Sequence, residues 1–141
     1  MRRSAALTGL SHQHHQGLFA ALQLKRADEQ SAHEARTAFL DFFEREGASH
    51  FREEEELLLP AFARHSRPDD PLIVRVLTEH VDLRLRAQDL RAGADPEPAA
   101  LHELGERLES HIRFEERVLF PQIEDALPVD ELERLGAALT R

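Results

Sequence analysis

The sequence has 141 residues, of which 41% are hydrophobic and 32% charged, and this composition predicts one soluble domain over residues 1–141. It contains no cysteine, which excludes disulfides, thiol nucleophiles and cysteine-bound clusters, so any metal site must use nitrogen and oxygen ligands. The net charge of −9 disfavours nucleic-acid binding, because phosphates carry the same sign.

Targeting signals and membrane spans are not expected. No apolar run approaches the roughly 20 residues that a bilayer span needs. The first residues are basic, but Ser11–His15 interrupt the apolar stretch that follows, which is not the pattern of a secretory signal. The sequence therefore predicts a cytoplasmic protein that does not bind membranes.

Apolar residues at three- and four-residue steps predict helices throughout the chain and no strand. The first helix spans about Ala5–Lys25, and the second spans about Ser31–His65. Gly47 weakens the second helix locally, and Pro60 predicts a bend or an early end in it.

The third helix follows a break at Pro68 and runs to about Ala92. Either Asp69 or Asp70 is expected to cap this helix, because both precede Pro71, and proline is favoured in a first helical turn.

The fourth helix spans about Ala99–Phe120, with Pro121 predicted to close or bend it, and a short C-terminal helix spans about Val129–Leu139. Helices of this length with short connections favour an all-α fold, an antiparallel up-down four-helix bundle with a short C-terminal helix.

The second and fourth helices carry a repeated motif. Between residues 50–60 and 111–121, the histidine, the arginine two positions on, the glutamates four and five on, the leucine eight on and the proline ten on all coincide. A bundle built from two such halves would have an approximate two-fold axis, and equivalent residues would meet around its centre.

The repeat places a histidine and a carboxylate on one helix face. Positions i and i+4 lie about 40° apart around an α-helix, so His50 points the same way as Glu54, and His111 the same way as Glu115. The glutamate after each pair points about 140° away and is a weaker candidate unless the helix widens locally.

The remaining two helices each supply a histidine. On the third, His80 lies among apolar residues; on the first, His14 shares an apolar face, and His15 is the alternative. A lone histidine on such a face is more often a core residue, but two matched copies with the carboxylates favour a metal site. Imidazole and carboxylate suit iron, manganese or zinc, and two bridging carboxylates would make a dinuclear centre.

The succession of these motifs, with Glu79 directly before His80, resembles the hemerythrin-like (HHE cation-binding) family over about residues 5–125. The resemblance implies a four-helix bundle with a non-haem di-iron centre, two iron ions that bind oxygen or related small molecules. By this resemblance the terminal ligands would be His14 (or His15), His50, His80 and His111, and the bridging ligands would be Glu54 and Glu115.

The third helix departs from the oxygen carriers of the family, which place two histidines four residues apart there. Val76 and Arg84 stand four residues to either side of His80, so the second histidine is missing. The sequence therefore predicts a protein that binds or senses oxygen, nitric oxide or peroxide, or holds iron. The alternatives are a redox enzyme of peroxide, oxygen or iron-donation chemistry, and a metal-free helical interaction module.

Overall fold

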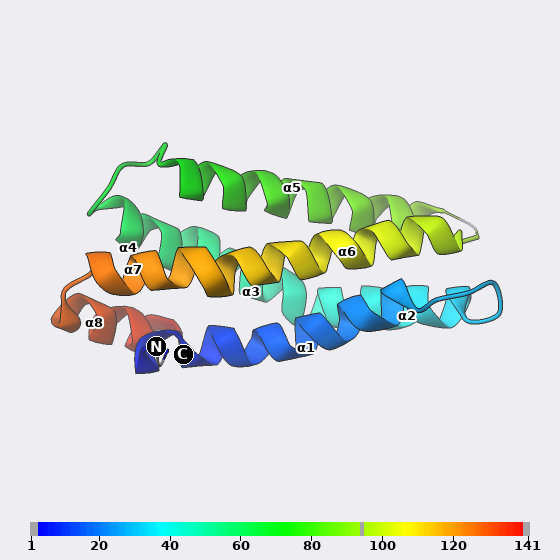
Figure 1. Ribbon diagram of the computed structural model, residues 1–141, viewed down its shortest axis with the longest axis horizontal. Coiled ribbons are helices and arrows are strands. Elements are labelled where there is room, and N and C mark those ends of the chain that lie inside the picture. The colour runs from blue at the N-terminus through cyan, green and yellow to red at the C-terminus, as the bar shows by residue number, and fades with distance from the viewer. Residues whose placement is uncertain (1–2, 94, 140–141) are drawn as a thin grey trace.

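Four helical rods lie side by side in the computed structural model, which describes residues 3–93 and 95–139 (Figure 1). Successive rods run in alternating directions, and the last helix folds back at the end where the two termini lie. The first rod is α1 (Thr8–Lys25), and the second consists of α2 (Ala32–Phe42), α3 (Ala48–Glu53) and α4 (Leu59–Ala63). The third rod is α5 (Pro71–Ala92), and the fourth consists of α6 (Pro98–Phe114) and α7 (Phe120–Ala126). The last helix, α8 (Val129–Leu139), follows the fourth rod. The described residues contain no strand, so the all-α prediction is confirmed.

Three widened turns keep the second and fourth rods continuous. They are π-helical segments, in which the backbone bonds reach five residues back, and they join consecutive α-helices. These segments are η2 (Phe43–Gly47), η3 (Glu54–Leu58) and η4 (Glu115–Leu119), while a short 3-10 turn, η1 (Ala5–Leu7), precedes α1.

The two prolines of the repeat do not end their helices, contrary to one expectation from the sequence. Pro60 lies inside α4 and Pro121 inside α7, because each follows a π-helical turn. Proline has no N–H, and its ring clashes with the carbonyl four residues before it in an α-helix. In the widened turn, the N–H of Leu59 instead donates to the carbonyl of Glu54, five residues back, and this geometry accommodates the proline.

Two predicted helix boundaries are confirmed. The carboxylate of Asp70 accepts a hydrogen bond of 2.8 Å from the N–H of Leu72, and Pro71 begins α5. The C-terminal helix spans Val129–Leu139, as the sequence indicates. The cap fixes where α5 begins. It therefore also fixes the level along the bundle axis at which each α5 side chain lies.

The apolar core is divided into two halves along the bundle axis. One half lies at the end that holds α4, α7 and α8, with Phe62, Phe120 and Ile123 among its buried residues. The other half lies between α1, α2, α5 and α6, with Phe39 and Leu101 among its members. The residues between these two halves are polar and form the candidate site.

Two glycines set the distance between neighbouring rods. A methyl group added at Gly105 of α6 would lie 2.7 Å from the backbone oxygen of Ala21 in α1. A methyl group at Gly17 of α1 would lie 2.7 Å from the Cδ1 atom of Ile112 in α6. The helices α1 and α6 therefore approach closely because neither side chain intervenes.

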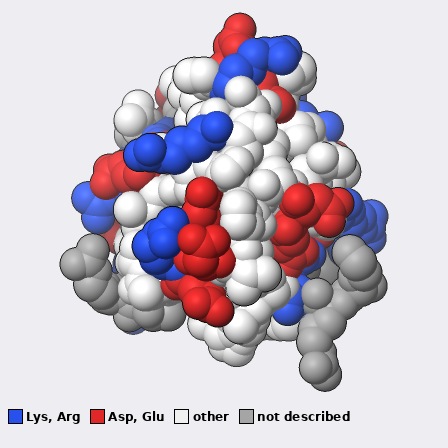
Figure 2. Space-filling model, turned by 90° about the vertical axis from the view of Figure 1, so that its left-hand side faces the viewer, with Lys and Arg blue, Asp and Glu red and all other residues white. Residues whose placement is uncertain are grey.

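Charged side chains of both signs lie among uncharged residues at the end of the molecule shown in Figure 2. Neighbours at this end include Arg67 with Asp69, at 3.0 Å, and Arg134 with Asp130, at 3.3 Å. Exposed pairs of this kind contribute little to stability. Among the described residues, no helix has the length and apolar character needed to cross a membrane.

We predict that Gly105→Ala lowers the free energy of unfolding by about 1–3 kcal/mol, because the added methyl overpacks the contact between α1 and α6. The matched control is Gly9→Ala in the first turn of α1, where an added methyl meets no atom of the described residues within 4 Å. That variant should keep or raise stability, by up to about 1 kcal/mol. Urea denaturation measures both, and equal effects would contradict the packing argument.

Candidate metal centre

A layer of six polar side chains crosses the middle of the bundle between the two apolar halves. All six are buried, with exposures between 0% and 7%. The layer consists of His14 from α1, His50 and Glu54 from the second rod, His80 from α5, and His111 and Glu115 from the fourth rod. The structure thus brings together six of the seven residues that the sequence predicts as ligands.

The first carboxylate, that of Glu54, lies between two histidines. Its Oε2 atom is 3.0 Å from Nε2 of His50, and its Oε1 atom is 3.1 Å from Nε2 of His80. Each oxygen therefore faces a different imidazole.

The second carboxylate, that of Glu115, repeats this arrangement. Its Oε1 atom is 2.9 Å from Nε2 of His14, and its Oε2 atom is 3.0 Å from Nε2 of His111. The potential ligand atoms form two groups that share both carboxylates, and within each group these atoms lie within 4.8 Å of one another. One group is His14, His50, Glu54 and Glu115, and the other is Glu54, His80, His111 and Glu115.

The seventh predicted residue, His15, does not join the layer. It is exposed on the far side of α1, where its ring lies 6.1 Å from that of His12. Only His14 of this pair faces the bundle interior. The sequence left the two open because both share a face with apolar residues.

The π-helical turns explain why two further glutamates also face inward. Two of the three widened turns, η3 and η4, begin at the buried glutamates of the repeat, Glu54 and Glu115. The glutamate that follows would point away in a regular α-helix, but here Glu55 and Glu116 both contact histidines. The sequence analysis made these two glutamates candidates only if the helix widens locally. That widening is present at both sites.

Carboxylates support three of the four histidines from the outside. Glu116 accepts a hydrogen bond from Nδ1 of His14 at 2.5 Å, and Glu55 accepts one from Nδ1 of His80 at 2.7 Å. Because an ionised carboxylate only accepts, Nδ1 carries the proton in each ring. When Nε2 gives up its proton, its lone pair faces the interior, as metal ligation requires.

The other two histidines also donate a hydrogen bond from Nδ1, but to different partners. Nδ1 of His111 donates to Glu79 at 2.7 Å, and Nδ1 of His50 donates to the amide oxygen of Gln13 at 2.7 Å. The sequence analysis gave neither Glu79 nor Gln13 a role as a supporting residue. Each directly precedes a histidine of the layer in the sequence but supports a histidine of a neighbouring rod, and no local pattern encodes that contact.

Aromatic rings hold two of the imidazoles from the side. The ring of Phe51 stacks on His80 with centroids 3.8 Å apart, and the ring of Phe120 stacks on His14 at 5.3 Å. The imidazoles are thus fixed by packing as well as by hydrogen bonds, which keeps their nitrogen atoms aimed at the centre.

The inward atoms are close to one another but do not satisfy one another. Among the described residues, both oxygens of Glu54 and Glu115, and Nε2 of His80 and His111, are buried without a hydrogen-bond partner. Buried polar atoms in this state are costly. Convergent imidazole and carboxylate donors suit iron, manganese or zinc, so these residues fit a metal centre.

Charge in the metal-free layer is balanced by protons. Burial lowers the pKa of His14 and of His80, but the carboxylates beside them outweigh it and raise each pKa to about 9. In the same way, burial lowers the pKa of His111, and Glu115 raises it to about 10. Burial raises the pKa of Glu115, but the neighbouring histidines hold it well below its usual range. A metal cation would take the place of these protons.

The third helix supplies one histidine to the layer, as the sequence predicts. Val76 is fully buried in the apolar core, and Nη1 of Arg84 donates to Glu55 at 2.7 Å. Arg84 therefore supports the carboxylate behind His80. Within the described residues, the two groups hold four histidines and no fifth.

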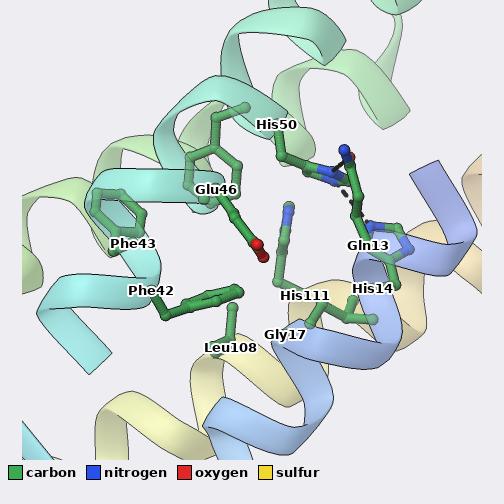
Figure 3. A pocket seen from close by; sticks show the side chains of 12 residues that line it. Gln13, His14, Gly17, Phe42, Phe43, Glu46, His50, Leu108 and His111 are labelled. Carbon is green, nitrogen blue, oxygen red and sulfur yellow. Dashed lines mark hydrogen bonds between the residues drawn. The ribbon is translucent and has the colours of Figure 1, made fainter. Parts of the chain in front are cut away.

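A small cavity of about 30 Å³ opens beside the layer, large enough for a water-sized molecule. Phe42, Phe43 and Leu108 give it an apolar lining, and His50 and His111 border it (Figure 3). The carboxylate of Glu46, from η2, points toward this space, although Glu46 itself is exposed to solvent. The sequence analysis did not identify Glu46, because a glutamate in a charged stretch usually faces solvent.

Comparison with known proteins identifies one family. The family model described as the hemerythrin HHE cation binding domain matches residues 8–133, which cover the four rods and the beginning of α8. No curated protein and no solved structure matches the chain.

We predict that the metal-free protein loses stability as the pH rises from about 7 to 10. A histidine whose pKa is raised by folding contributes stability below its unfolded pKa, and this contribution is lost as the pH passes its folded pKa. His14, His80 and His111, with a pKa of about 9 to 10, all change in this direction. Thermal denaturation in the presence of a chelator measures the effect, and a melting temperature that rises over this range would contradict it.

Proposed function

The chain belongs to the hemerythrin HHE cation binding family, and we propose that its central layer binds two iron ions. One ion would be held by His14 and His50 and the other by His80 and His111, with Glu54 and Glu115 bridging them. The match over residues 8–133 also supports the proposal that residues 1–141 form a single domain.

The arrangement of the shared carboxylates carries this proposal. Glu54 and Glu115 each direct one oxygen to a histidine of either pair, at 2.9–3.1 Å. Two cations lying between such pairs would satisfy the four unpartnered carboxylate oxygens at once. Manganese and zinc accept the same donors, so the choice of iron depends on the family as well as on the ligands.

For the activity, we propose that the protein binds or senses a small ligand such as oxygen, nitric oxide or peroxide in the cytoplasm, or holds iron. Iron bound here would supply ligand binding and electron transfer. The protein supplies the cavity, whose largely apolar lining suits a small uncharged molecule. With four histidines and two glutamates in the layer, at least one coordination position would remain for that ligand.

A redox enzyme is the second candidate, and Glu46 favours it. Its carboxylate points toward the cavity beside the layer, where it could give or take a proton during oxygen or peroxide chemistry (Figure 3). A protein that only binds its ligand has no need of a proton carrier at this position.

We predict that His14→Ala and His111→Ala each lower the bound iron by at least half, because each removes one nitrogen ligand from the layer. The matched control is His15→Ala, next to His14 on the exposed side of α1, which should keep its iron. Elemental analysis of protein reconstituted with ferrous iron measures the content, and circular dichroism checks the fold. Equal iron content in all three variants would remove the site.

Rapid-mixing spectroscopy separates the two candidate activities. If the protein binds or senses a ligand, oxygen or nitric oxide should produce a stable change in the iron absorption bands without consumption beyond the amount of protein. If it is an enzyme, peroxide should be consumed over many cycles, and Glu46→Gln should slow this by about 10²-fold or more, as expected for loss of a proton-transfer group. Turnover that Glu46→Gln leaves unchanged would exclude this role for Glu46.

A further inference from the structure

The outer partners of the histidines divide the two halves of the layer unequally. In one half, both histidines donate Nδ1–H to a carboxylate: His80 to Glu55 and His111 to Glu79, each at 2.7 Å. In the other half, only His14 has a carboxylate partner, and His50 donates to the neutral amide oxygen of Gln13.

An arginine binds each of the three supporting carboxylates and balances its negative charge. The difference between these carboxylates and the neutral Gln13 therefore does not come from unbalanced charge. Arg84 donates to Glu55 at 2.7 Å, and Arg75 donates to Glu79 at 3.0 Å.

Arg3 similarly donates to Glu116 at 3.3 Å. Glu116 also accepts a hydrogen bond of 2.8 Å from Ser11 on the oxygen that faces His14, and Oε2 of Glu55 is shared in the same way between His80 and Arg84. The half of the layer that contains His50 is therefore the weaker one, because His50 has a neutral outer partner while the outer partners of the other three histidines are carboxylates.

Outer hydrogen-bond partners of this kind change how strongly a histidine binds a metal ion. A carboxylate that accepts the Nδ1–H raises the electron density at Nε2, and loss of such a partner typically lowers metal affinity by about 10–100-fold. An amide oxygen accepts the same hydrogen bond without a negative charge. His50 is thus a weaker donor than the three histidines that have carboxylate partners.

The two halves of the layer also differ in their access to solvent, and the half that contains His50 is the more accessible one. The cavity is lined by Gln13 and by both histidines of the first half, His14 and His50, but by only one histidine of the other half, His111, because His80 does not border it. His50 is also the most exposed of the four histidines, at 7%, while His80 is fully buried. The weaker half is therefore also the half that exchanges more readily with solvent.

We propose that the two metal positions load in order, the His80–His111 position first and the His14–His50 position second, and that Gln13 is the positioning residue that sets the gap between them. This inference rests on the proposed dinuclear centre. It assigns the His14–His50 ion as the one that is gained last and lost first.

The test uses zinc alone, titrated into metal-free protein that carries ¹⁵N-labelled histidine. With one equivalent of zinc, the Nε2 signals of His80 and His111 should move to their bound positions while those of His14 and His50 stay free. The second equivalent should move the remaining pair, with a weaker dissociation constant measured by competition against a chelator.

Gln13→Glu should tighten the second binding step by about 10-fold, the lower end of the range for outer partners. The matched control is Gln23→Glu, which adds the same charge on the exposed side of the same helix, away from the layer, and should leave both steps unchanged. The reciprocal variant, Glu79→Gln, should weaken the first step by a similar factor, and it tests the same idea if Gln13→Glu does not fold.

Two results would overturn the ordered loading while leaving the metal centre in place. One is simultaneous movement of all four histidine signals with less than one equivalent of zinc. The other is a second step that Gln13→Glu and Gln23→Glu tighten equally, since this would reflect charge alone. A protein that binds neither zinc nor iron would instead overturn the proposed function and, with it, the order of loading.

Discussion

Two carboxylates lie in the middle of this bundle, away from water, and the rest of the site is arranged around them. Glu54 and Glu115 are fully buried, and a buried charge is costly unless it is paired. His14, His80 and His111, whose pKa is raised, answer that requirement as cations, and all four surrounding imidazoles could do so as ligands around a shared metal. The outer glutamates, arginines and Gln13 then hold the imidazoles so that their nitrogens face inward. The removal of either carboxylate would leave the layer with only one of its two organising charges.

The helices meet this constraint by a local change of pitch. A regular α-helix would direct the two consecutive glutamates of each repeat to different sides. The π-helical turns that begin at Glu54 and Glu115 let the first glutamate face one centre while the second reaches a histidine of another rod. The same turns accommodate Pro60 and Pro121, so one departure from α-helical geometry serves both the site and the continuity of the rods.

Much of the architecture and of the layer could be predicted from the sequence, because both depend on periodicity. The repeat of histidine and glutamate four residues apart predicts which side chains meet in the interior, and breakers such as Pro68 predict the connections. Three features were beyond this reasoning. The choice of His14 over His15 depends on the rotation of α1, which close packing against Gly105 determines. The continuity of the helices through Pro60 depends on a widened turn. The supporting role of Gln13 depends on the relative height of two rods, which no local pattern encodes.

The division of the core into two apolar halves has a consequence for how the chain finds its native arrangement. Leucines, alanines and phenylalanines fill both halves, and such residues pack acceptably in many relative positions. If one rod slid by a turn, about 5.4 Å, the carboxylate of Glu54 or Glu115 would face aliphatic side chains instead of imidazole. Misaligned bundles are therefore penalised at the central layer even where their apolar contacts are good. The polar layer therefore sets the register of the four rods, and it would do so before any metal is bound.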